Sequence, residues 1–447
     1  MVRAFLSGLL GVVLCLAGVG LALAEGPGPA ETLDPQHQVL VLMKTPPEHF
    51  RPNADYSGGY GDGQGRSARR RIAGRLAREH GLTLVSDWPL PLIGLDCYVM
   101  QAPSNQSPDA VAARLSHEPS VAWSEPMNLY HGQGEAQGHG VAQGQGVAQG
   151  QGVVQGQGVV QGLGEATHND PLYRVQPAAR EWRLADLHEI STGRNVRVAV
   201  IDSMVERTHP DLLGQIQVSE NFVADRAVAP EQHGTGVAGI IAALADNGLG
   251  IAGVAPHARL MALRACWQLS GPPVSTVCDS LSLAKAVHFA IAHNAQVINL
   301  SLSGPPDPLL GRLLDVALEH GVIVVGAFDR TLPGGGFPAS HAGVVAVAEE
   351  SPRLTPAGIF SAPGRDVPTT QPGGRWFLVN GGSYAAAHVS GLFALLRERN
   401  AFTLSGSSLV TLPPGGAIDA CATLLRTSGP CNCACSRARQ LSAVVRQ

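Results

Sequence analysis

Three short stretches decide the fold of this chain: VAVIDS at residues 198–203, QHGTGVAG at 232–239 and NGGSYAAAHV at 380–389. The first is typical of an apolar strand that ends in an acid. The second and third are typical of small-residue helices that begin with a histidine and a serine. Asp, His, Ser is one of the three known chain orders of a catalytic acid, base and nucleophile. The three stretches therefore predict acyl transfer, most simply peptide hydrolysis.

Further segments surround these three and make the pattern specific. HPDL at 209–212 follows the acid, GIAGVAP at 250–256 follows the histidine helix, and VINLSL at 297–302 comes next. Together and in this order the segments resemble the subtilisin-like (S8 family) serine proteases, from about Asn169 to Leu396. The resemblance implies a serine endopeptidase that works through an acyl-enzyme.

Strands alternate with helices across this region, which predicts an α/β fold with a mostly parallel sheet and helices on both faces. Sites in such folds gather at the carboxyl ends of the strands. Asp202 is expected to orient His233, which would take a proton from Ser383. Taken one at a time, each residue is equally compatible with a cap or a buried polar group; their order and context favour the triad.

By resemblance, Ser301, Leu302 and Ser303 form the strand edge that pairs with an extended substrate. Leu302 would line the pocket for the residue before the cleaved bond. The family usually has Gly where Ser303 stands, so we expect a narrower pocket. Tyr384 likewise stands where the family usually has Met.

The resemblance breaks at the corner GAFDR, residues 326–330, where the family places an Asn that donates to the oxyanion. An ungapped comparison puts Arg330 at that position, and a one-residue shift puts Asp329 there. Arg330 can donate, although its reach differs from that of an amide, whereas an ionised Asp329 would repel the oxyanion. The alternative function is therefore a catalytically attenuated, protease-shaped binding or scaffold protein.

A calcium ion is a further expectation from the resemblance, although no cofactor is required for the chemistry. Asp211 and Asn247 match positions where family members hold calcium through oxygen atoms. Both side chains are equally compatible with solvent-facing loop positions. His209 and His388 are interpreted as a turn residue and a buried helix residue, not as additional bases.

The rest of the chain divides by composition. Residues 1–24 are predicted to be a signal peptide, with a membrane anchor as the alternative. Residues 25–131 read as strand, helix, strand, helix and strand. They resemble the small α+β pro-domain that inhibits these proteases and assists their folding, with an unrelated small domain as the alternative. Residues 132–165 carry a Gly-Val-Ala/Val-Gln-Gly-Gln repeat and are predicted to be a flexible linker rather than a β-solenoid. A catalytic domain (166–400) and a Cys-rich extension (401–447) follow.

Net charge and cysteine content indicate which partners and which compartment to expect. A net charge of −4 gives no support for nucleic-acid binding. Without Cys15 and Cys97, which the signal and pro-segment carry, six of the eight cysteines remain, an even number suited to three disulfides in an oxidising compartment. Cys266 and Cys278 are the most plausible pair, and the cluster at 431–435 suits disulfides better than a metal. We therefore expect a secreted or periplasmic zymogen with peptide or protein substrates and no membrane span after signal removal.

The pro-domain is expected to act as an intramolecular inhibitor of its own protease. Release would follow self-cleavage near residues 130–132 or within the linker.

Overall fold

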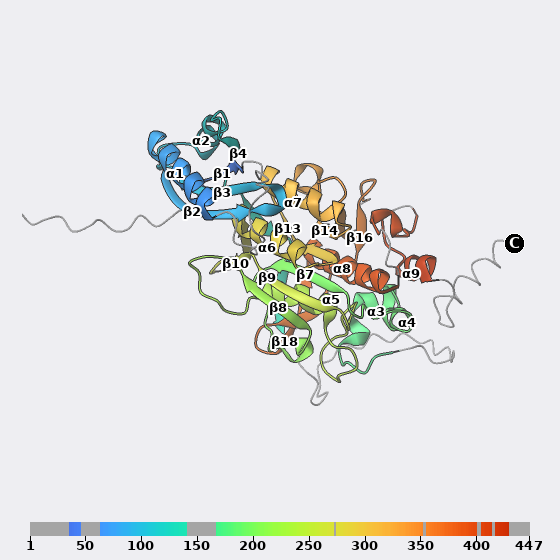
Figure 1. Cartoon of the computed structure of the whole chain (residues 1–447). Coiled ribbons are helices and arrows are strands. Elements are labelled where there is room, and N and C mark those ends of the chain that lie inside the picture. Colours follow the sequence, from blue (N-terminus) through green and yellow to red (C-terminus); the bar gives the residue numbers. More distant parts are fainter. Residues whose placement is uncertain are drawn as a thin grey trace, which may run out of the picture. The chain divides into compact units, whose positions relative to one another are not determined.

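The computed structural model of the 447-residue chain describes residues 35–45, 63–140, 167–271, 274–351, 355–399, 404–413 and 416–428 (Figure 1). The predicted signal peptide, most of the repeat linker and the cysteines at 431–435 lie outside these residues. The described residues all belong to one unit that begins at Pro35. No helix in this part of the chain has the length and apolarity that a membrane span needs.

Seven parallel strands form the central sheet. Their order is β16 (Phe360–Ala362), β15 (Val345–Glu349), β14 (Ile323–Ala327), β12 (Val297–Leu300), β7 (Arg197–Asp202), β9 (Arg259–Arg264) and β8 (Ile216–Asn221). The inner strands are almost wholly buried, which explains why they read as continuous apolar runs. The predicted α/β fold with a mostly parallel sheet is confirmed.

Helices cover both faces of this sheet. Along β7, Val198 and Val200 belong to one buried cluster, with α5 (Gln232–Ala242) and α8 (Gly382–Arg399). The alternate residues of β7 belong to a second cluster, with α6 (Ser280–Ala292) and α7 (Pro308–Glu319). The two short helices α3 (Pro177–Glu181) and α4 (Leu184–His188) precede β7. Each β–α connection thus places its loop at one edge of the sheet, where a site can form.

The N-terminal region forms a separate four-stranded antiparallel sheet. Its order is β2 (Thr83–Leu90), β3 (Leu95–Gln101), β1 (Gln38–Lys44) and β4 (Val121–Pro126), and the helices α1 (Gly63–Glu79) and α2 (Pro108–Leu115) accompany it. Residues of β1 that face away from these helices, such as Leu40 and Leu42, join the cluster that contains α6 and α7. The predicted α+β pattern is present, with β2 as a strand that the sequence analysis did not identify.

Two strands lie at the start of the segment predicted to be a linker from residue 132. The chain leaves β4 and forms β5 (Leu129–Gly132) and β6 (Glu135–Gly140), each of which pairs with catalytic-region strands. β5 lies between β11 (Thr276–Asp279) and β13 (Leu302–Ser303), in a sheet whose fourth strand is β10 (Cys266–Gln268). β6 extends the hairpin of β17 (Val367–Gln371) and β18 (Arg375–Asn380). Polar, glycine-rich residues become ordered here because neighbouring strands supply their backbone partners.

The catalytic region also continues past the predicted boundary at residue 400. Helix α9 (Ala420–Ser428) packs beside α8, and Leu409, Ile418 and Leu424 belong to the same buried cluster as α8. The first part of the predicted extension is therefore part of the core.

Candidate active site

Asp202 and His233 form a buried ion-pair contact at the carboxyl end of the central sheet. Asp202 is the last residue of β7, and His233 lies in the first turn of α5. Nδ1 of His233 is 2.7 Å from Oδ1 of Asp202, and both side chains are almost fully buried. Because Nδ1 faces the carboxylate, Nε2 is the nitrogen left for proton transfer. Nε2 is buried and has no hydrogen-bond partner within the described residues.

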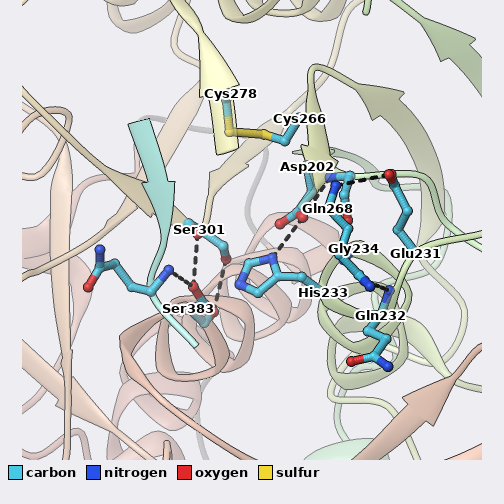
Figure 2. A network of polar contacts seen from close by, with 12 residues as sticks. Asp202, Glu231, Gln232, His233, Gly234, Cys266, Gln268, Cys278, Ser301 and Ser383 are labelled. Atoms are coloured by element: carbon cyan, nitrogen blue, oxygen red, sulfur yellow. Dashed lines mark hydrogen bonds and ion pairs between the residues drawn. A yellow bond between two sulfur atoms is a disulfide. The ribbon is translucent and has the colours of Figure 1, made fainter. Parts of the chain in front are cut away.

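Ser383 lies on the other side of this imidazole, at the start of α8 (Figure 2). Its Oγ donates a hydrogen bond to the carbonyl oxygen of Ser301 at 2.8 Å and accepts one from the N–H of Gln133 at 2.8 Å. No hydrogen bond joins Ser383 to His233 among the described residues. The structure thus brings the three predicted residues into one site, with the acid–base pair formed and the hydroxyl turned toward Ser301.

A segment of the chain itself lies beside Ser383, in the gap between β11 and β13 that is called the groove below. In β5, His131 is opposite Ser303 and Gly132 is opposite Leu302, in antiparallel register. On its other edge β5 pairs with β11, and the N–H of Gln133 donates to the carbonyl of Ser301 at 3.4 Å. Residues 301–303, the edge predicted to bind substrate, thus contact residues 131–133 of the chain itself.

One peptide bond of this segment lies directly at the serine. The backbone N–H of Ser383 donates to the carbonyl oxygen of Gln133 at 3.0 Å. This N–H belongs to the first turn of α8, where the helix dipole favours negative charge on an oxygen. Beyond Gly134 the chain continues as β6, with Glu135 opposite Asn380 on β18. The bond between Gln133 and Gly134 is thus held between two short sheets.

Tyr130, three residues before Gln133, is the buried anchor of this segment. Its ring lies 6.4 Å from that of Phe337 and rests against Gly304, where any Cβ would overlap the ring. Its hydroxyl is within hydrogen-bond distance of the carbonyl of Pro305 (3.2 Å) and of Oδ2 of Asp307 (3.1 Å). A buried phenol with polar partners for its hydroxyl fixes the register of the whole strand.

The altered corner contributes no second donor to the carbonyl of Gln133. Asp329 accepts two hydrogen bonds from Thr331, from the N–H at 2.8 Å and from Oγ1 at 2.6 Å. Arg330 is exposed, and its side chain makes no hydrogen bond or ion pair to any described residue. Neither of the two candidates that the sequence left open donates a hydrogen bond to the carbonyl of Gln133. Within the described residues, the N–H of Ser383 is the single donor to this carbonyl.

The groups around Asp211 do not fit a calcium ion. Its Oδ1 accepts from Nδ2 of Asn247 at 2.9 Å, and its Oδ2 accepts from the N–H of Ile251 and from Nε1 of Trp376. Oδ1 of Asn247 in turn accepts from the N–H of Leu249. Burial raises the pKa of Asp211 to about 6. Since each of these oxygens faces an N–H donor, a calcium ion would find no free ligand at Asp211 and Asn247.

A second group, His168, Asp170 and Asp246, has ligand atoms close enough together for a cation. These side chains are engaged with the protein, however. Nδ1 of His168 contacts Asp246 at 2.9 Å, and both oxygens of Asp170 accept backbone N–H groups. We assign no metal to either group.

His388 and His209 lie where the sequence analysis expected them, in a helix and in a turn. His388 is buried in α8 and its Nδ1 contacts the carbonyl oxygen of Tyr384 at 2.8 Å. Burial lowers its pKa to about 4, so it is neutral near pH 7. His209 is buried in the turn before Asp211 and accepts the N–H of that residue.

The cysteine prediction is confirmed where the structure tests it. Cys266 and Cys278 form a disulfide that joins β10 to β11, one strand away from the bound segment (Figure 2). Cys421 is also disulfide-bonded. Cys97 is a buried free thiol in β3. The cluster at 431–435 lies outside the described residues.

Sequence reasoning missed the residues that present the bond, chiefly Tyr130, Gln133 and Gly134, and it missed Asp307. One signal was present: residues 132–134 read Gly-Gln-Gly, the tripeptide that recurs in the repeat after them. Tyr384 was noted only as a departure from the family. In the structure its ring lies 5.7 Å from that of His233.

Comparisons with known proteins agree with this geometry. The model of the family described as the subtilase family matches residues 193–412. Subtilisin from Bacillus pumilus is 34% identical over 226 residues, which are 47% of this chain and 79% of that protein. Subtilisin E from Bacillus subtilis (strain 168) is 34% identical over 226 residues, 47% of this chain and 57% of that protein. The chain thus spans little more than half the length of several curated relatives.

Among solved structures, fervidolysin from Fervidobacterium pennivorans, a keratinolytic enzyme related to subtilisin, is similar with a TM-score of 0.62. It is 21% identical, and the match covers 88% of this chain and 61% of that one. At this identity the likeness concerns the fold alone.

Proposed function

The chain belongs to the subtilase family, and from this premise we propose that it is an exported serine endopeptidase made as a self-inhibited precursor. The bond that it cleaves in itself is the one between Gln133 and Gly134. One observation carries the proposal: the carbonyl of Gln133 accepts the N–H of Ser383 at 3.0 Å while residues 131–133 lie in the groove as a paired strand. A reacting carbonyl beside a nucleophile and an N–H donor is the arrangement that acyl transfer requires.

The reaction proceeds through the side chains already described. The hydroxyl of Ser383 rotates from the carbonyl of Ser301 toward Nε2 of His233, which takes its proton as Oγ adds to the carbonyl carbon of Gln133. The Asp202 carboxylate stabilises the imidazolium that forms. The C–N bond to Gly134 then breaks, and His233 passes the proton to the departing nitrogen. Water hydrolyses the ester on Ser383 by the same steps in reverse.

The bound strand also explains inhibition. After cleavage, β5 keeps its pairing with β11 and β13, and Tyr130 keeps its buried site, so the N-terminal region continues to block the groove. The proposed cut lies just past residues 130–132, at the beginning of the repeat segment. Active enzyme appears only when this region dissociates or is degraded.

The alternative, a protease-shaped binding or scaffold protein, is favoured by a different observation. The carbonyl of Gln133 has one N–H donor where the family has two groups, and the hydroxyl of Ser383 bonds to Ser301 instead of His233. Loss of one oxyanion donor costs about 10²- to 10³-fold in rate. The intact acid–base pair favours a slow or selective enzyme over an inactive one.

Export is proposed from the sequence of residues 1–24 and is consistent with the disulfide between Cys266 and Cys278. The compartment would be the periplasm or the exterior, and the substrates peptides or proteins. We propose no cofactor and no nucleic-acid partner.

The test is intact-mass analysis of the purified full chain with and without a fluorophosphonate probe, beside the Ser383→Ala variant. We expect the native chain to yield its first new N-terminus at Gly134 and, once the N-terminal region has dissociated, one probe adduct. The variant should remain whole and unlabelled. A native chain that stays as intact and as unlabelled as Ser383→Ala would support the binding protein instead.

A further inference from the structure

Two glycines flank the residue whose carbonyl lies at Ser383, and both are in close contact with the site. A Cβ on Gly132 would lie 3.1 Å from Cβ of Thr276 and 3.2 Å from the ring of His233. A Cβ on Gly134 would lie 2.5 Å from the ring of Tyr384, closer than side-chain atoms approach in folded proteins. The site therefore has no space for a methyl group after Gln133. Before Gln133 a methyl group would fit only if its neighbours moved by a few tenths of an ångström.

Burial limits how far the ring of Tyr384 can move away from Gly134. It is 2% exposed in the first turn of α8. Its opposite edge rests near α5, where a Cβ on Gly236 would be 3.5 Å from Cε1, and its face is 5.7 Å from His233. A side chain enclosed in this way resists displacement, because core groups are closely packed and overpacking costs about 1–3 kcal/mol.

The side chain of Gln133 is not held in a comparable way. Its Nε2 donates to the carbonyl of His131 at 3.3 Å, within the bound strand itself. The steric selection thus acts on the residues before and after Gln133.

Resting on the proposed function, we propose that the enzyme selects peptides with glycine on both sides of the residue that supplies the cleaved carbonyl. Tyr384 is the specificity-determining residue for the glycine that follows the bond. The selected pattern is Gly-X-Gly, cut after X, and in the repeat of this chain the pattern is Gly-Gln-Gly.

This selection gives the repeat segment a function. The same tripeptide recurs at residues 144–146, 150–152 and 156–158, at six-residue spacing. The residue three places before each Gln is Ala142, Ala148 or Val154, where the first copy has Tyr130. The first copy therefore has the aromatic anchor and is cut first. The others are further substrates for the same groove, so the linker is trimmed by the enzyme that it precedes.

The test in the full chain compares Gly134→Ala with Gly74→Ala. Gly74 lies in α1, where an added Cβ would meet only the end of the Arg78 side chain at 3.7 Å, and it serves as the matched control. We expect Gly134→Ala to slow the cut after Gln133 by about 5- to 150-fold, the range that the overpacking cost above corresponds to, and Gly74→Ala to leave it unchanged. Adding Tyr384→Ala to Gly134→Ala should restore much of the lost rate. Cleavage of Gly134→Ala at the native rate would overturn the inference.

A second experiment does not depend on the folding of Tyr384 variants. Processed native enzyme, from which the N-terminal region has been removed, is given the peptide Tyr-His-Gly-Gln-Gly-Glu-Ala-Gln and its partner with Ala in place of the second Gly. We expect at least a tenfold preference in kcat/KM for the first peptide, and a ladder of native chain ends after Gln145, Gln151 and Gln157. Equal rates for the two peptides, or a linker cut mainly outside Gly-Gln-Gly, would refute the selection. Absence of any cleavage or labelling would instead contradict the proposed function.

Discussion

Docking of the N-terminal region onto the catalytic region should weaken as the pH rises, because of a buried pair of carboxyl groups. Glu125 of β4 is 4% exposed, and its Oε2 accepts the indole N–H of Trp123 and the N–H of Leu309 on α7. Its Oε1 is buried with no donor facing it, and Asp307 is its acidic neighbour. Only a proton on Glu125 lets the two groups form a hydrogen bond.

That proton belongs on Glu125 because Asp307 already has several donors. The hydroxyl groups of Ser280 and Tyr130, the amide of Asn128 and a backbone N–H in α7 all point to its oxygens. Oε1 of Glu125, in contrast, has no donor within the described residues. Burial, followed by the charge of Asp307, raises the pKa of Glu125 to about 9.

The sign follows from the number of protons bound. The docked state holds a proton on Glu125 that an undocked Glu with an ordinary pKa releases, so the stabilisation is complete below that ordinary pKa. It is then lost progressively as the pH rises toward about 9. The slope is at most about 1.4 kcal/mol per pH unit. Between pH 5 and pH 8 the loss in docking free energy adds up to on the order of 4 kcal/mol, roughly a thousandfold change in the docking equilibrium.

The assay is urea unfolding of the uncleaved Ser383→Ala chain from pH 5 to pH 8, with and without Glu125→Gln. The amide keeps the shape of the protonated acid and can donate to Asp307, so we expect a shallower dependence on pH for the double variant. Hydrogen exchange of the β5 amides should show the same difference, since these amides are released on undocking. Parallel curves for the two chains would refute the reasoning.

Other predictions follow from the same contacts. Arg330→Ala and Asp329→Ala should each change kcat by less than about threefold, because neither side chain donates to the reacting carbonyl; a fall of 10²- to 10³-fold in steady-state kinetics would show that one of them does. Replacing Cys266 and Cys278 by Ser should lower the free energy of unfolding by about 3 kcal/mol in urea titrations, since their disulfide closes a short loop; an unchanged midpoint would contradict this. EDTA should leave the Tm of the uncleaved chain within about 1 °C, because the Asp211 oxygens accept N–H groups. A Tm that rises by several degrees with added calcium would reveal a bound ion after all.

The sequence predicted the central architecture because its signals are local. The apolar run before Asp202 and the small-residue helix after His233 need only their own spacing to indicate a strand and a helix. The linker prediction was wrong for residues 132–140 for the opposite reason. Glycine- and glutamine-rich residues have no strand signal of their own, and they become β5 and β6 only because distant strands pair with them.

By itself, then, the sequence determined the α/β fold. It also predicted Asp202, His233 and Ser383 as the site and residues 301–303 as its edge. Only the tertiary structure decided three points. They are which peptide bond lies at Ser383, that no side chain of the altered corner donates to its carbonyl, and that the ring of Tyr384 packs against Gly134. These facts depend on contacts between residues that are from 82 to 250 positions apart. Such contacts depend on how whole elements pack, and they cannot be predicted from the spacing of residues along one segment.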